Sequence, residues 1–137
     1  MSLDTTRVAE VMHEGVLDCA PQTPLAEVAA LMASRSVHCV VVDGLERDPR
    51  GGEHLVWGLV SDRELMAAAS DSRLDAPAGE VAAGEVVTVE PADTAREAAR
   101  LMAEHECSHL IVTDPRSGRP LGVVSSLDVA RAAAGAR

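Results

Sequence analysis

The stretch Gly122-Val123-Val124-Ser125-Ser126-Leu127-Asp128 decides the fold that we expect for this chain. An apolar strand ends at Ser125, and a helix that runs to Ala134 begins there. A serine at the N-cap followed by an acid three residues later has the spacing of a capping box. Free N–H groups at a helix start attract phosphate, and a carboxylate one turn in can accept from two adjacent hydroxyls, as on a ribose. An ordinary helix cap explains the same spacing where it occurs only once.

The same pattern occurs a second time, 64 residues earlier, in Gly58-Leu59-Val60-Ser61-Asp62-Arg63-Glu64. Upstream of the two stretches, similar positions recur at an offset of 70 residues, as in Pro21 and Pro91. A repeat of this length is one supersecondary unit that does not bury its apolar face alone. The offset falls from 70 to 64 because the first repeat carries extra residues, which we place in a solvent loop over residues 43–53.

Each repeat is predicted to contain a strand, a helix, two strands and a helix, after a short leading helix. Apolar residues at i, i+3, i+4 and i+7 predict the long helix of each repeat, and we expect Thr23 and Asp93 to cap these helices. β-branched runs predict the paired strands. We place the first repeat at residues 8–69, a linker at 70–77 and the second repeat at 78–134.

The composition limits the possible functions. Apolar residues make up 47% of the 137 residues, which is typical of a globular chain. The formal net charge of −10 argues against binding to nucleic acid or to an anionic membrane, both of which need a basic face. All 12 basic residues are Arg, which excludes a Walker-type phosphate loop and Schiff-base chemistry.

The sequence predicts neither a membrane span nor a signal peptide. No apolar run approaches the roughly 18 residues that span a bilayer, and the N-terminus lacks a signal-peptide pattern. The abundance of Ala, Val, Arg and Gly is typical of a GC-rich genome. We therefore expect a cytoplasmic, bacterial protein.

Two cysteines lie beside histidines at corresponding places in the repeats, Cys39 beside His38 and Cys107 close to His109. A metal site built from these residues is conceivable, but small buried thiols beside strand-start histidines are the simpler interpretation. We therefore predict no metal. Since the sequence shows no convincing set of nucleophile, base and orienting residue, we also predict that the protein is not an enzyme.

The ordered set of motifs, which occurs twice, resembles the running pattern of CBS domains. The matching segments of the first repeat are Val8 to Met12, Val16, Pro21, Leu31-Met32, Val40 to Val42 and the Gly58 stretch, and the second repeat matches from Leu101 to Val112 and from Gly122 to Asp128.

This resemblance implies an α+β fold in which two pseudo-twofold-related β-α-β-β-α repeats form one compact module, called a Bateman module. Members of the family are regulatory proteins that bind adenosine-containing ligands such as AMP, ADP, ATP or S-adenosylmethionine, and they commonly form homodimers. The resemblance therefore implies a small-molecule ligand, a homodimer and an unknown regulated protein, without a required cofactor.

The resemblance also implies which residues bind the ligand. Asp128 corresponds to the residue that holds the ribose hydroxyls, Ser125 lies on the phosphate side, and His109 takes the place of a basic residue that faces phosphate. The remaining residues of this site line the cleft or contact the base: Val123, Leu17, Val37 and His38. A second, weaker site is implied by the mirror positions Ser61, Glu64, Val87 and Ser108. Glu64 departs there from the usual Asp, and its extra methylene pushes the carboxylate towards the ribose.

The sequence is compatible with two functions from different classes. The leading interpretation is a stand-alone regulatory module that binds an adenosine-containing ligand between its repeats and signals through a partner or dimer. The alternative is a structural or protein-interaction dimer whose cleft has lost its ligand.

Overall fold

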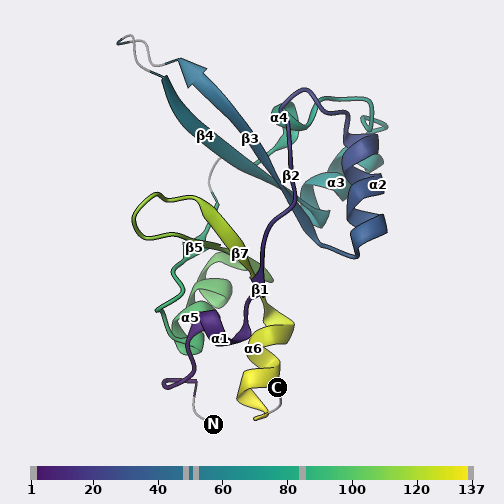
Figure 1. The fold of residues 1–137 in the computed structure, drawn as a ribbon. Helices are drawn as coiled ribbons and strands as arrows, with labels where there is room; N and C mark the ends of the chain where they lie inside the picture. Colours follow the sequence, from purple (N-terminus) through teal and green to yellow (C-terminus); the bar gives the residue numbers. More distant parts are fainter. Residues whose placement is uncertain (1–2, 48–49, 51–52, 84–85, 136–137) are drawn as a thin grey trace. The chain divides into compact units, whose positions relative to one another are not determined.

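The computed structural model describes residues 3–47, 50, 53–83 and 86–135 (Figure 1). It confirms a mixed α+β fold built from two repeats. The first repeat supplies α1 (Val8–Val11), β1 (His13–Glu14), β2 (Asp18–Cys19), α2 (Leu25–Arg35), β3 (Cys39–Arg47), β4 (Glu53–Ser61) and α3 (Asp62–Ser70). The second repeat supplies α4 (Ala78–Val81), β5 (Thr88–Val89), α5 (Ala95–His105), β6 (His109–Thr113), β7 (Pro120–Ser125) and α6 (Ser126–Ala133).

The compact units of the structure differ from the repeats of the sequence. Unit 1 comprises Met1–Val16 with Val86–Arg137, and unit 2 comprises Leu17–Glu85. The leading helix of each repeat thus joins the body of the other repeat. Backbone hydrogen bonds hold this exchange in place, because Val8 N–H donates to the Asp93 carbonyl and Ala78 N–H donates to the Thr23 carbonyl, both at 2.8 Å.

The sheet of unit 2 has the order β2-β3-β4, and an isolated antiparallel bridge joins Leu59 of β4 to Ala83. Strand β2 is parallel to β3, while β3 and β4 form a long antiparallel hairpin. The hairpin contradicts the predicted solvent loop over residues 43–53, because β3 continues to Arg47 and β4 begins at Glu53. The antiparallel pairing continues from Cys39 opposite Ser61 to Arg47 opposite Glu53, so the backbone ladder overrides the polar composition. Residues 48–49 and 51–52 of the predicted loop lie outside the described part of the chain.

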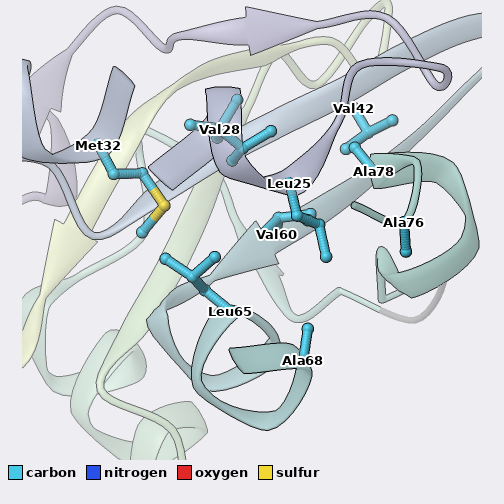
Figure 2. Close-up of a cluster of buried hydrophobic side chains, with 10 residues drawn as sticks. Leu25, Val28, Met32, Val42, Val60, Leu65, Ala68, Ala76 and Ala78 are labelled. Atoms are coloured by element: carbon cyan, nitrogen blue, oxygen red, sulfur yellow. The ribbon is translucent and has the colours of Figure 1, made fainter. Parts of the chain in front are cut away.

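The core of unit 2 lies between its hairpin and its helices α2 and α3. Leu25, Val28 and Met32 form the buried stripe that the helical spacing predicts, and they point towards the hairpin (Figure 2). Strand alternation turns Val40 and Val42 to the same face of the sheet. The other buried members of this cluster come from β4, α3 and the segment that leads into α4: Val60, Leu65, Ala68, Ala76 and Ala78.

Unit 1 repeats this arrangement with a sheet of order β1-β7-β6-β5. Strand β1 lies antiparallel to β7, which places His13 opposite Val123 and Glu14 opposite Gly122. The buried cluster draws residues from α1, α5, α6 and the sheet: Val8, Val89, Ala98, Met102, Leu110, Val112, Val124 and Val129. Val8 is fully buried, so the exchanged helix α1 is part of the core of unit 1.

The predicted caps of the two long helices were wrong by one residue. Pro24, without a side-chain cap, precedes α2, and the N–H group of Leu25 donates instead to the Ala76 carbonyl at 3.0 Å. Thr94 caps α5 by accepting from Glu97 N–H at 3.1 Å. Asp93, which we expected at the cap, accepts from Glu90 N–H at 2.8 Å in the preceding turn.

Candidate functional site

The junction between β7 and α6 holds a buried carboxylate against a helix start. Oδ2 of Asp128 accepts hydrogen bonds from the N–H group of Ser125 at 2.8 Å and from its hydroxyl at 3.0 Å. The N–H group of Asp128 donates in return to Oγ of Ser125 at 3.2 Å. Asp128 is only 4% exposed, so this predicted capping box is also a buried acidic group with a fixed orientation.

The second oxygen of this carboxylate faces a histidine from the other repeat of the sequence. Nε2 of His13 lies 3.1 Å from Oδ1 of Asp128. His13 reaches this position because β1 pairs with β7, which sets His13 opposite Val123. The His13 side chain is 71% exposed, in contrast to its buried partner.

Unit 2 contains the equivalent junction, between β4 and α3. Oε1 of Glu64 accepts from the N–H group of Ser61 at 2.8 Å and from its hydroxyl at 2.7 Å. Ala83 lies beside Leu59 there, as His13 lies beside Val123 in unit 1. The two junctions therefore share a serine and an acid, but they differ in the residue that lies across the neighbouring strand.

Four of the predicted site residues lie together in unit 1. The start of β6 places His109 opposite Ser125 of β7. Nδ1 of His109 lies 2.9 Å from the hydroxyl of Ser108, and both side chains are at least partly accessible. Together with Val123 and Asp128, Ser125 and His109 are the four residues predicted for the first site that belong to unit 1. Ser108 belongs to the second predicted site.

The three other residues predicted for the first site, Leu17, Val37 and His38, belong to unit 2. The carbonyl of Leu17 accepts from Val41 N–H at 2.8 Å, which anchors the entry into β2. Val37 follows the left-handed C-cap of α2, and Nδ1 of His38 lies 3.4 Å from a carboxylate oxygen of Asp62. The side chains of His38 and Asp62 are both more than half exposed, so water weakens this ion pair.

The predicted second site divides between the units in the same way. Ser61 and Glu64 belong to unit 2, whereas Val87 and Ser108 belong to unit 1. The carbonyl of Val87 accepts from Ile111 N–H at 3.4 Å, at the entry into β5. For each predicted site, the serine and the acid of the helix junction belong to one unit, and the predicted strand-start residue on the other repeat belongs to the other unit.

Sequence reasoning missed His13 as a functional residue. The sequence pattern assigns each leading helix to its own repeat, so it does not connect a residue that follows the first leading helix with the last helix of the chain. The offset of 70 residues does contain a signal, because it aligns His13 with Ala83 and thereby marks a polar residue in one repeat where the other has a methyl group.

The buried thiol of Cys39, beside His38, is a poor nucleophile. Burial, helped by the neighbouring Asp62 and Glu64 carboxylates, raises the pKa of Cys39 to about 11. Burial also raises the pKa of Cys19. Within residues 3–47, 50, 53–83 and 86–135, no group of three or more His, Cys, Asp or Glu side chains is placed to hold a metal ion.

The chemistry of these junctions suits binding. A buried carboxylate accepts hydrogen bonds from hydroxyl groups, and the start of a helix offers N–H groups and a positive dipole end to an anion. In the part of the chain that the structure describes, no helix is both long and apolar enough to cross a bilayer.

Comparison with known proteins identifies the class. The sequence profile of the CBS domain matches residues 8–71 and again residues 78–135. These two matches cover most of the chain, so the protein belongs to the CBS domain family and carries two CBS domains in tandem. No curated protein sequence shows significant similarity to it.

Solved structures share the fold. The CBS domain pair of protein MJ0100, in complex with 5′-methylthioadenosine and S-adenosyl-L-methionine, superposes with a TM-score of 0.78 at 19% identity and covers 95% of this chain and 97% of its own. An uncharacterized conserved protein from Pyrococcus horikoshii gives a TM-score of 0.79 at 21% identity, with 97% and 95% covered. The CBS domain protein PAE2072 from Pyrobaculum aerophilum, complexed with AMP, gives 0.72 at 26% identity, with 89% and 88% covered.

Proposed function

We propose that this protein is a stand-alone regulatory module that binds an adenosine-containing ligand through the Ser125–Asp128 junction. The observation that carries the proposal is the buried Asp128 carboxylate, which the capping box holds at the start of α6. A fixed, desolvated carboxylate suits a vicinal diol, because charge-assisted hydrogen bonds gain strength away from water. Membership of the CBS family and the complex of PAE2072 with AMP support the choice of ligand class.

In this proposal Asp128 accepts from the ribose hydroxyls, and Ser125 and the start of α6 lie on the phosphate side. His109 supplies a donor towards phosphate from β6. The resemblance to CBS domains also assigns Leu17, Val37 and His38 to the base. AMP, ADP, ATP and S-adenosylmethionine are the candidate ligands.

A second, weaker site uses Glu64 and Ser61, together with Val87 and Ser108. Both hydrogen bonds from Ser61 go to Oε1 of Glu64. The longer side chain changes the position from which the carboxylate can accept, so we expect lower affinity for the same ligand.

The module acts without catalysis, as a homodimer that signals to a partner protein. Exposed apolar side chains on the outer helices support association, since Met66 of α3 is 60% exposed and Leu127 of α6 is 56% exposed. Three free cysteines fit a reducing cytoplasm. Light scattering at tens of micromolar measures the assembly, and a monomer mass there contradicts the homodimer.

One observation favours the alternative function, a structural or protein-interaction dimer without a ligand. Asp128 already has internal partners on both carboxylate oxygens, Ser125 on one and His13 on the other. A carboxylate satisfied in this way can serve as a structural group only.

A ligand panel separates the two functions. Thermal unfolding is measured with AMP, ADP, ATP and S-adenosylmethionine, because a ligand at 100 times its Kd adds about 2.7 kcal/mol to the free energy of unfolding. Calorimetry then compares AMP with 2′-deoxy-AMP, which lacks one hydroxyl of the diol. We expect Asp128→Ala to abolish the preference for AMP over 2′-deoxy-AMP. The control Glu104→Ala, which removes an exposed carboxylate on α5, leaves this preference unchanged. If none of the four compounds stabilises the parent protein, the interaction-module alternative replaces the proposal.

A further inference from the structure

We infer that His13 is an internal competitor for the ligand: its imidazole occupies the oxygen of Asp128 that the ribose diol needs, and ligand binding displaces it. The inference rests on the proposed function of Asp128 and adds a residue that sets the affinity of that site.

The hydrogen bonds of Asp128 show why the two cannot bind together. A carboxylate offers about four acceptor positions, two on each oxygen. The N–H group and the hydroxyl of Ser125 fill both positions on Oδ2, at 2.8 and 3.0 Å. Only Oδ1 remains for a diol that donates two hydrogen bonds, and Nε2 of His13 already lies 3.1 Å from it.

Of the two partners, His13 is the one that can move. Its side chain is 71% exposed, so rotation away from Asp128 transfers the imidazole to water. Asp128 is 4% exposed and tied to the helix start by its cap. The backbone of β1 stays in place during this change, because its pairing with β7 does not involve the imidazole.

The equivalent position in unit 2 lacks this competitor. Ala83 lies beside Leu59, and a methyl group cannot donate a hydrogen bond to Glu64. The competition is therefore confined to the β7–α6 junction. It lowers the affinity of the site that contains Asp128, the better-placed of the two acids.

The test is calorimetry with AMP on three histidine variants. His13→Ala removes the competitor, and we expect AMP to bind roughly three- to tenfold more tightly, the range for loss of one partly exposed ionic hydrogen bond. His13→Gln restores a side-chain N–H donor and returns the affinity towards that of the parent. His105→Ala, which removes a histidine at the exposed end of α5 in the same unit, leaves the affinity unchanged.

The outcomes separate this inference from the proposed function. Tighter binding of AMP by His13→Ala than by the parent supports the inference. Equal or weaker binding by a folded His13→Ala, while the parent binds AMP, overturns the competition and leaves the proposed function standing. If no variant binds AMP, S-adenosylmethionine or ATP, both are overturned. Thermal unfolding of each variant checks that it is folded.

Discussion

Gly122 lies in direct backbone contact with His13: a Cβ atom added to Gly122 would overlap the His13 carbonyl oxygen. This contact explains why β7 carries a glycine at position 122. The pairing of β1 with β7 needs a residue without a side chain at this position. The corresponding Gly58 shows a milder form, with an added Cβ 3.0 Å from the Ala83 carbonyl oxygen and 3.2 Å from the Ala82 Cβ.

The first prediction is that Gly122→Ala destabilises the protein more than Gly58→Ala. The new methyl group must push β1 away from β7, and overpacking of this kind typically costs about 1–3 kcal/mol. Urea unfolding of both variants and the parent measures the order. Equal stability of Gly122→Ala and the parent contradicts the close approach of β1. Loss of the His13–Asp128 contact is expected as a secondary effect of the same substitution.

The second prediction concerns the exchanged helices. Val8 is fully buried in the core of unit 1, so Val8→Ala should lower the free energy of unfolding by about 2 kcal/mol. Hydrogen exchange should increase in α5, α6 and β5 to β7 of the second repeat. Val81→Ala, which truncates a partly buried side chain on the other leading helix, should increase hydrogen exchange in residues 17–83 instead. If Val8→Ala speeds hydrogen exchange only in the first repeat, this result contradicts the packing of α1 with the second repeat.

Much of the fold could be predicted from local patterns in the sequence. The stripe of Leu25, Val28 and Met32 and the β-branched run of residues 40–42 are each patterns within one element, which neighbouring residues reveal. The partner of each leading helix could not be predicted in this way. Both repeats offer nearly the same apolar surface to α1, and a repeat pattern does not state which copy the helix joins.

The same limit applies to the candidate site. The cap formed by Ser125 and Asp128 has a local spacing of three residues, and the sequence predicted it correctly. The contact between His13 and Asp128 joins residues 115 positions apart, through the pairing of β1 with β7. The long hairpin was missed for a related reason, because backbone pairing stabilises strand residues whose side chains favour loops.

The third prediction is a loss of stability at alkaline pH that depends on Cys39. Its pKa is raised from 9.0 to about 11 in the folded protein, chiefly by burial. A raised pKa means that the folded state disfavours the thiolate, so the contribution is fully present below pH 9 and is lost as the pH rises towards 11. The expected loss is about 2–3 kcal/mol. Urea unfolding from pH 8 to 11 measures it.

Cys39→Ala is the control for this loss, because it removes the titrating group and should flatten the slope between pH 9 and 11. The same pKa predicts slow alkylation of Cys39 at neutral pH, since the thiolate is the reactive form. Rapid labelling of Cys39 at pH 7 in the folded protein contradicts this environment.

The fourth prediction separates the structural role of the two acids from their binding role. Asp128→Ala removes the acceptor of both Ser125 hydrogen bonds and of the His13 contact, while Glu64→Ala removes the acceptor of two hydrogen bonds from Ser61. As caps the two acids are similar, so each substitution should cost about 1–2 kcal/mol in urea unfolding.

As groups that bind the ligand, Asp128 and Glu64 differ. Two charge-assisted hydrogen bonds to a diol are worth roughly 1.5–3 kcal/mol each, so Asp128→Ala should weaken AMP binding at least about tenfold. Glu64→Ala should weaken it less. If the two variants lose stability equally but Glu64→Ala loses more affinity in calorimetry, the principal site lies at the β4–α3 junction, where Ala83 leaves the acid without a competing histidine.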